Sequence, residues 1–151
     1  MIGNLIEQQI EELLKDNVWG HLGCNDGFNT YIYPINYLYD GKYITCHSQQ
    51  GFKIQVMRKN KGICLQVDEV KDDKNWKSVM VLGTYQELDD EREYRDAMRA
   101  FTHRRLHLKI SESPQLPDTN GHETIMKLKK DNRPAIFRIV IHEKTGKFEN
   151  E

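Results

Sequence analysis

Hydrophobic residues near the start of the chain recur at helical spacing. Leu5, Ile6, Ile10, Leu13 and Leu14 fall on one side of a helix, and acidic and glutamine residues occupy the other side. This spacing predicts an amphipathic helix that packs its apolar side against the rest of the fold. Because segments with strand character follow, we expect this helix to cover a sheet.

Three segments with strand character come next, and turn residues separate them. Residues 18–23 and 29–39 are rich in Val, Ile and Tyr, and Asn25-Asp26-Gly27 stands between them. Asp40-Gly41 then separates the second segment from a third over residues 42–47. Asn, Asp and Gly accept the positive φ angles of tight turns, so the pattern predicts two successive β-hairpins.

The pattern changes from strand to helix between residues 51 and 61. Phe52 and Val56 lie four positions apart there, and Gly62 follows. This spacing favours a short helix that a glycine ends, with Ser48 near its start.

The second half of the chain predicts another hairpin and a charged helix. Residues 63–70 and 78–88 have β character on either side of a polar turn. Residues 91–106 carry an apolar stripe in a charged segment, as expected of a surface helix. Residues 111–121 hold two prolines, two serines, Asn and Gly, which predicts a surface loop at a substrate opening.

Alternating residues predict a last strand over 135–141, and the polar end that follows contains a Thr145-Gly146 turn. The predicted elements are mainly strands, with helices at the flanks. The sequence contains no internal repeat, linker or low-complexity segment. We therefore expect residues 1–151 to form a single domain.

Charge and targeting features narrow the classes of function. The chain has 22 Lys and Arg against 23 Asp and Glu, so no overall field favours nucleic acid or an anionic membrane. The N-terminal segment lacks the basic start, apolar run and cleavage site of a signal peptide, and no window approaches a membrane span. We expect a cytoplasmic protein in which any anion site is local.

The cysteines and histidines indicate no metal site. Cys24, Cys46 and Cys64 are odd in number and show no CxxC spacing, so we expect reduced, buried thiols. His103 and His107 stand four positions apart on the predicted helix. Because the sequence offers them no third partner, they are expected to be solvated charges.

Three segments together carry a family resemblance. They are YPINYLYDGKYITCHSQQGFK from residue 33, MRKNKGICLQVDE from residue 57 and WKSVMVLGTYQEL from residue 76. In this order and spacing they resemble the pyridoxamine 5'-phosphate oxidase-like FMN-binding split barrels, and among them the nitroimidazole-resistance (Nim-type) flavoproteins. The resemblance covers residues 18–88. It implies a mainly β, six-stranded, Greek-key antiparallel split barrel with flanking helices, which forms a homodimer with FMN at the interface.

The residues from His47 to Lys53 have the features of a phosphate site. They run from a predicted strand end into a helix start, where free backbone N–H groups and the helix dipole favour an anion. Lys53 adds a charge, Ser48 a hydroxyl donor, and Gly51 allows close approach of the backbone. The alternative is a capped helix with a solvated lysine.

The resemblance suggests further contacts and one departure. The position of Phe52 is often basic in the family, so this chain lacks an expected second phosphate contact. Lys77 resembles a basic position on the neighbouring strand that would compensate, and Ser78 resembles a residue that meets the flavin. Trp76 is expected to cover part of the ring, or else to pack in the core or a dimer interface.

The resemblance places the flavin ring against two strands, where Tyr33, Pro34, Asn36 and Thr45 are the expected contacts. A proline cannot donate a ladder hydrogen bond, so Pro34 marks either an ordinary edge or an interruption beside a ligand. His47 is expected over the flavin as a proton donor or an anion contact. The alternative is a histidine that is hydrogen-bonded at a strand end.

The preferred function is an FMN-dependent oxidoreductase that passes electrons from NADH or NADPH to a small acceptor such as a nitroaromatic. No Gly-x-Gly-x-x-Gly motif follows a strand, so the nicotinamide is expected to visit the flavin pocket, with ping-pong kinetics.

Three alternatives stay open for the function. The first is a non-catalytic binder of flavin or haem that acts as a sensor, store or stress factor. The second is a pyridoxamine-phosphate-oxidase-like enzyme, although only Arg138 matches that enzyme's arginine-rich C-terminal segment. The third is a structural dimer with a vestigial site, for which Phe52 is the argument.

Overall fold

The computed structural model describes residues 1–108, 128–129 and 132–151. Helices α1 (Glu7–Asp16), α2 (Phe52–Lys59) and α3 (Glu91–Leu108) lie where the sequence predicts helices. The strands are β1 (Ile2–Asn4), β2 (Trp19–Asn25), β3 (Thr30–Tyr39), β4 (Tyr43–Ser48), β5 (Gly62–Asp72), β6 (Asn75–Glu87) and β7 (Ala135–Glu149). The predicted loop at 111–121 lies outside the described residues.

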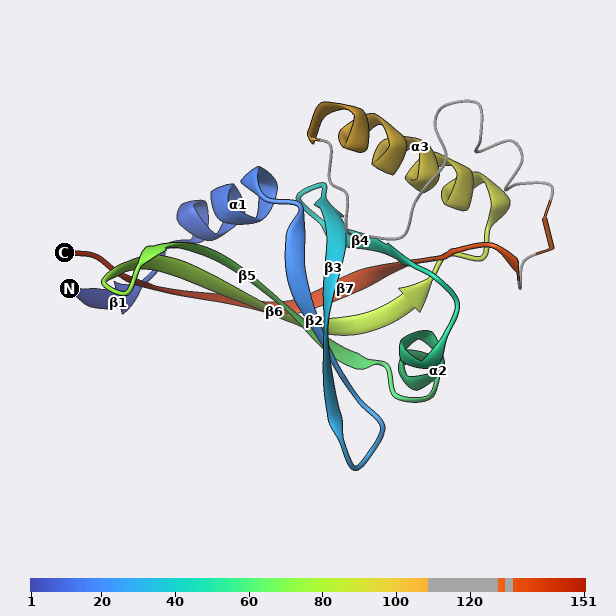
Figure 1. Cartoon of the computed structure of the whole chain (residues 1–151), viewed down its shortest axis with the longest axis horizontal. Coiled ribbons are helices and arrows are strands. Elements are labelled where there is room, and N and C mark those ends of the chain that lie inside the picture. Colours follow the sequence, from blue (N-terminus) through green and yellow to red (C-terminus); the bar gives the residue numbers. More distant parts are fainter. Residues whose placement is uncertain (109–127, 130–131) are drawn as a thin grey trace.

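The strands form one antiparallel sheet in the order β1-β7-β4-β3-β2-β5-β6. An additional pairing of β6 with β7 closes six of them into a barrel (Figure 1). The predicted fold class is confirmed, with a correction to the strand count. The three-residue β1 pairs with the last part of β7 and adds a seventh strand. A segment this short shows no alternation in the sequence, so no pattern predicted it.

Both predicted tight turns are confirmed. Gly27 has a φ of 103° and Gly41 a φ of 95°, a region that favours glycine. In the second turn, an Asp40 carboxylate oxygen accepts the backbone N–H groups of Lys42 at 2.8 Å and Tyr43 at 2.7 Å. Aspartate therefore fixes the turn through its side chain, as its local hydrogen bonding predicts.

The predicted end of the last strand is wrong. β7 continues through the expected Thr145-Gly146 turn to Glu149, with β6 on one side and β1 on the other. Gly146 is needed for packing, because a Cβ there would lie 2.8 Å from Leu5 Cδ1. The backbone N–H of Leu5 donates to the Gly146 carbonyl at 2.9 Å. Glycine in a strand here marks a close approach of another segment.

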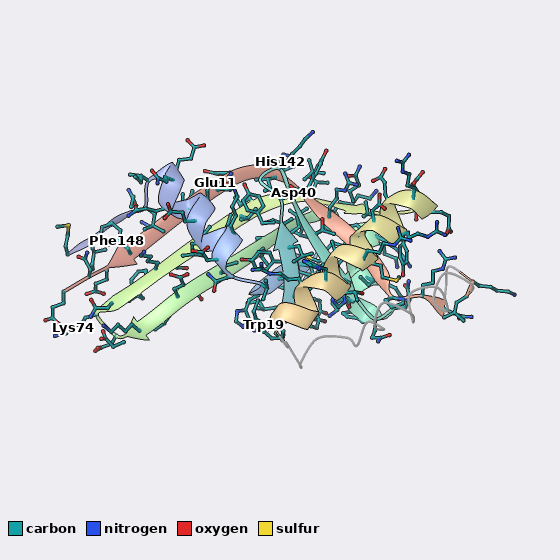
Figure 2. The ribbon with its side chains drawn as sticks, turned by 90° about the horizontal axis from the view of Figure 1, so that it is seen from above. Glu11, Trp19, Asp40, Lys74, His142 and Phe148 are labelled. Atoms are coloured by element: carbon teal, nitrogen blue, oxygen red, sulfur yellow. The ribbon has the colours of Figure 1, made fainter. Side chains whose placement is uncertain are left out.

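The core lies inside the barrel, and helices cover the outside and one end. Its fully buried members include Leu22, Ile35, Tyr37, Ile44, Leu65, Val81, Phe137 and Ile139. α1 adds Leu13 and Leu14 to this core, whereas α3 packs Met98 and Phe101 on the outer side of the barrel. Figure 2 shows α1 and α3 lying across the strands on one side of the molecule.

All three cysteines are free thiols, with Cys24 and Cys46 buried and Cys64 half-buried. Among the described residues, no helix combines the length and the apolar character that a membrane crossing needs.

Candidate functional site

Strand β3 has an open edge beside α2. On one side it pairs with β2 from Thr30 to Asn36, but on the other side its pairing with β4 covers only Tyr37 to Tyr39. β4 ends at Ser48, and the chain then turns into α2. Among the described residues, the backbone of residues 30–36 therefore has no strand partner on the side facing α2. Pro34 lies within this stretch, which confirms its predicted edge position.

The open edge carries aromatic rings and one cation. The Nζ atom of Lys53 lies 5.1 Å from the centroid of the Tyr33 ring. Phe52 meets Tyr31 edge-on at 5.1 Å between centroids, and the two tyrosines stack at 6.5 Å. We call Tyr31, Tyr33, Phe52 and Lys53 the edge cluster. It places the predicted phosphate-binding lysine directly against the strand predicted to hold the ring.

Lys53 is a half-buried cation without an acidic partner among the described residues. Burial lowers its pKa below the ordinary lysine value, and the neighbouring thiols of Cys24 and Cys46 oppose part of that shift. Removing an ammonium from water is unfavourable unless a counter-charge is present. The position therefore suits an incoming anion.

Helix α2 begins without a cap. Gly51 is its N-cap residue and provides no side-chain cap, and within the part of the chain that the structure describes Gln55 is the first helical residue whose backbone N–H reaches a backbone acceptor, the Gly51 carbonyl at 3.2 Å. Free N–H groups at a helix start attract anions. A Cβ at Gly51 would meet no atom within 4 Å, so the folded chain has space at this position.

Ser48 belongs to the same turn, but its hydroxyl is already engaged. The side chain is buried, and Oγ donates to the Gln49 carbonyl at 3.0 Å. Donation to a phosphate stays a prediction, because the hydroxyl would have to rotate away from this carbonyl.

His47 and Thr45 face α3, away from the open edge. His47 is only 3% exposed, and its ring meets the Phe101 ring edge-on at 4.5 Å between centroids. Thr45 pairs with Leu38 and Arg138, and Leu38 packs against the residues of α3. His47 therefore packs as a core residue, and this geometry does not support the expected proton donor over a flavin.

Two further predicted contacts hold other parts of the chain together. Asn36 is buried, and its Nδ2 donates to the Val18 carbonyl at 3.1 Å. Arg138 pairs with Glu93, and its guanidinium lies 4.5 Å from the Tyr43 ring centroid. Neither side chain is free to meet a ligand at the open edge.

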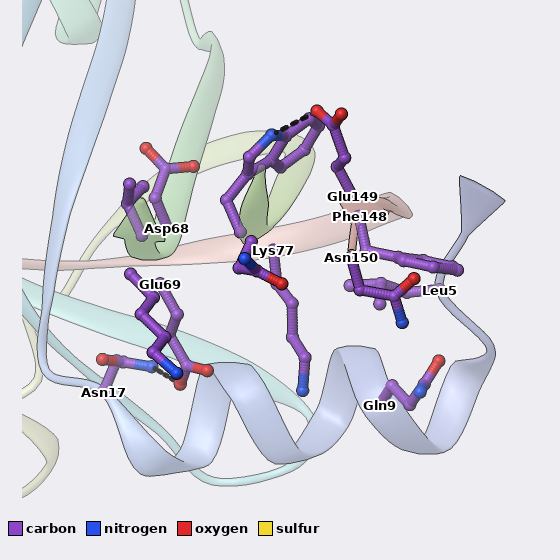
Figure 3. A pocket seen from close by; sticks show the side chains of 13 residues that line it. Leu5, Gln9, Asn17, Asp68, Glu69, Lys77, Phe148, Glu149 and Asn150 are labelled. Atoms are coloured by element: carbon purple, nitrogen blue, oxygen red, sulfur yellow. Dashed lines mark hydrogen bonds between the residues drawn. The ribbon is translucent and has the colours of Figure 1, made fainter. Parts of the chain in front are cut away.

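The residues predicted on the neighbouring strand lie at the other end of the barrel. Trp76, Lys77 and Ser78 begin β6 beside the β5–β6 hairpin, whereas α2 lies at the opposite end (Figure 1). Lys77 points toward α1 into a cavity of about 590 Å³ that Leu5 and Phe148 also line (Figure 3). Adjacent residues of a strand face opposite sides, so Ser78 faces away from this cavity. Lys77 therefore does not compensate for Phe52 within one chain.

Sequence patterns do not reveal the side chains that hold the turn before α2. The amide of Gln50 donates to the Arg133 carbonyl at 3.1 Å and accepts from Arg58 at 3.2 Å. Arg58 in turn pairs with Glu87 at 2.8 Å. These residues lie up to 83 positions apart, and a glutamine beside a glycine is too common a pattern to reveal such contacts.

Comparison with known proteins identifies similar chains. The sequence pattern of the pyridoxamine 5'-phosphate oxidase family matches residues 7–147. A solved FAD-binding protein of Mesorhizobium loti is 26% identical, with a TM-score of 0.74 over 100% of this chain and 98% of that one. A candidate 5-nitroimidazole antibiotic resistance protein of Bacteroides thetaiotaomicron is 18% identical, with a TM-score of 0.71 over 98% of this chain and 87% of its own. At that identity the likeness shows the fold alone.

An uncharacterised protein of Rhizobium meliloti is similar over part of its length. It is 38% identical over 86 residues, which are 57% of this chain. The chain spans about half of that relative, 52% of its length.

Proposed function

Because this chain belongs to the pyridoxamine 5'-phosphate oxidase family, we propose that it binds FMN at the open edge of β3 and acts as a flavin-dependent oxidoreductase. The proposal depends on one observation, the unpaired β3 edge beside the uncapped start of α2 and Lys53. FMN combines a flat ring, whose edge donates and accepts hydrogen bonds, with a phosphate tail. The two parts of the edge match these two parts of the cofactor.

The residues of the edge have separate roles in this proposal. The unpaired backbone around Pro34 meets the ring edge, and Tyr33 lies between the ring and Lys53. The N–H groups that follow Gly51 bind the phosphate, and Lys53 supplies the counter-charge. Because residue 52 is a phenylalanine and not a basic residue, Lys53 is the single cation of the edge cluster.

A second copy of the chain would cover an apolar face of the barrel. Ile32, Met80 and Leu82 are 68%, 42% and 40% exposed. Ile32 and Leu82 stand in one row across four strands, through Gly23 and Cys64. We call Ile32, Met80 and Leu82 the outer apolar face. A homodimer that buries it would remove these side chains from water.

The homodimer also explains why the predicted contacts are divided between two ends of the barrel. Ser78 faces the same side of β6 as Met80, because alternate strand residues share a face. Trp76 lies two positions before Ser78 in β6, so its side chain faces the same side of the strand. In the proposed dimer, Trp76 and Ser78 of one copy meet the FMN that the edge cluster of the other copy holds.

The flavin would supply the redox chemistry, by accepting electrons from NADH or NADPH and giving them to a small acceptor such as a nitroaromatic. The chain's own residues bind the phosphate, orient the ring along β3 and leave the exposed side of Pro34 open to the second substrate. One site at the β3 edge would then serve both substrates in turn, which predicts ping-pong kinetics.

A flavin binder without turnover is the second candidate function. It is favoured by the burial of His47 beneath Phe101, which removes the expected proton donor from the edge. Visible absorbance of the purified protein tests for bound flavin, and anaerobic addition of NADH or NADPH separates the two candidates. Bleaching of the flavin colour supports the oxidoreductase, whereas a protein that stays yellow supports the binder.

A further inference from the structure

The turn between β4 and α2 is held by a side chain that uses both ends of its amide. Gln50 Nε2 donates to the Arg133 carbonyl at 3.1 Å, and Gln50 Oε1 accepts from Arg58 Nη2 at 3.2 Å. Gln50 directly precedes Gly51, the N-cap of α2. Its side chain therefore ties the uncapped helix start to the segment just before β7 on one side and to α2 itself on the other.

Arg58 is itself firmly placed. Its Nε and Nη2 atoms donate to the two carboxylate oxygens of Glu87 at 2.8 and 3.1 Å. The Tyr85 hydroxyl donates to the same carboxylate at 2.5 Å. Burial raises the pKa of Glu87, but the hydrogen bonds from Arg58 and Tyr85 outweigh it and lower that pKa. The Arg58–Glu87 ion pair therefore stays ionised at neutral pH. Its two parallel hydrogen bonds hold the guanidinium in place, so that Arg58 Nη2 is a fixed donor for Gln50.

Arg133 is equally fixed on the other side. It is 8% exposed, and it donates to Glu91 of α3 at 2.9 Å and to the Leu128 carbonyl at 3.1 Å. Its carbonyl is thus a rigid acceptor for Gln50. Because both partners are anchored in other elements, the contacts of Gln50 set the direction of the turn.

We propose that Gln50 is a positioning residue for the cofactor phosphate, an inference that rests on the proposed function. Its two hydrogen bonds would hold the backbone at Gly51, and with it the free N–H groups at the start of α2, in one direction beside the β3 edge. Gln50 does not touch the cofactor in this arrangement. It fixes the donors before the ligand arrives, and pre-organised donors bind an anion more tightly than mobile ones.

The experiment compares Gln50→Ala with Gln49→Ala. Gln49 is the exposed neighbour, and its side chain makes no hydrogen bond in the described part of the chain. Each variant and the wild type are titrated with FMN and with riboflavin, which has the same ring but no phosphate. We expect Gln50→Ala to weaken FMN binding by roughly three- to tenfold, the net worth of about one hydrogen bond. Riboflavin binding and the Gln49→Ala variant should be unchanged.

Equal losses for FMN and riboflavin, or no loss for either, would overturn the positioning role. Amide hydrogen exchange of the flavin-free protein gives an independent reading at Gln55, whose N–H donates to the Gly51 carbonyl. Gln50→Ala should speed exchange of this amide, and Gln49→Ala should not. Unchanged exchange there contradicts the inference even if FMN binds. A wild-type chain that binds no FMN contradicts the proposed function first, and the inference with it.

Discussion

The ammonium of Lys53 lies over the ring of Tyr33, with Nζ 5.1 Å from the ring centroid. Lys53 lies in the first turn of α2 and Tyr33 belongs to β3, and they meet because β4 ends at Ser48 and the chain turns there into α2. The contact therefore joins the uncapped helix start to the unpaired strand edge. The position of the proposed flavin site follows from this relationship.

Removing the charge of Lys53 should weaken FMN binding selectively. Lys53→Ala is expected to cost about 1.5–3 kcal/mol of FMN binding, the worth of a hydrogen bond to a charged group. Lys59→Ala is the matched control, because Lys59 is exposed in the last turn of the same helix. Quenching of flavin fluorescence measures both. Equal retention of FMN in the two variants would remove Lys53 from the site.

FMN binding should fall as the solution becomes alkaline. Burial lowers the pKa of Lys53, so its ammonium loses its proton below the ordinary lysine value of about 10.4. The attraction to phosphate is complete at neutral pH and is lost as pH rises through that lowered pKa. For the flavin-free protein the sign is opposite, because the unfolded chain holds more protons in this window and stability rises with pH. In Lys53→Met both trends should be absent. Riboflavin has no phosphate, so its binding to the wild-type protein should not show the fall expected for FMN.

Adding a methyl group at residue 51 tests the phosphate position from the backbone side. Gly51 has extended backbone angles, and a Cβ there meets no atom within 4 Å. Gly51→Ala should therefore leave the melting temperature of the flavin-free protein unchanged while it weakens FMN binding. A variant that binds FMN as well as the wild type would place the phosphate elsewhere.

Charge on the outer apolar face should separate the proposed dimer. Leu82→Asp puts a carboxylate into the face, and burying an unpaired charge is strongly unfavourable. We expect a shift to monomer in analytical ultracentrifugation together with loss of flavin. Ile6→Asp is the control, since Ile6 is 62% exposed at the N-cap of α1, where aspartate is well tolerated. A wild-type protein that is already monomeric would contradict the dimer.

His47 should matter for stability and not for flavin binding. The ring is buried against Phe101, so His47→Ala removes an aromatic contact and leaves a gap under α3. The free energy of unfolding should fall by roughly 1–3 kcal/mol. Chemical denaturation measures this, and FMN affinity should stay close to that of the wild type. Normal stability with lost turnover would instead restore the predicted proton donor.

Local patterns in the sequence were enough to predict most of the fold. The helices follow from apolar spacing, and the turns at Gly27 and Gly41 follow from residues that accept positive φ. Gly146 was misread because a glycine in a turn and a glycine beneath a packed helix look alike in sequence. Only the position of Leu5 against β7 distinguishes them.

The site was predictable in part. An edge proline and a basic helix start have local signatures, which predict the positions that Pro34 and Lys53 take in the fold; their contacts with a flavin stay predictions. The structure places the His47 ring against Phe101 of α3, and strand alternation could not show this, because it gives two faces but does not say which one α3 covers. Lys77 and Ser78 are neighbours in sequence but face opposite sides of β6. The sequence does not show that, of the two, only Lys77 lines the cavity beside α1. The contacts of Gln50 depend on long-range packing.

Titration of the purified wild-type protein with FMN and with riboflavin tests the central claim most directly. The account predicts that FMN binds, stays with the protein through gel filtration and colours it yellow, and that riboflavin binds more weakly because it lacks the phosphate. A colourless protein that takes up neither FMN nor FAD, or one that binds riboflavin as tightly as FMN, would contradict it.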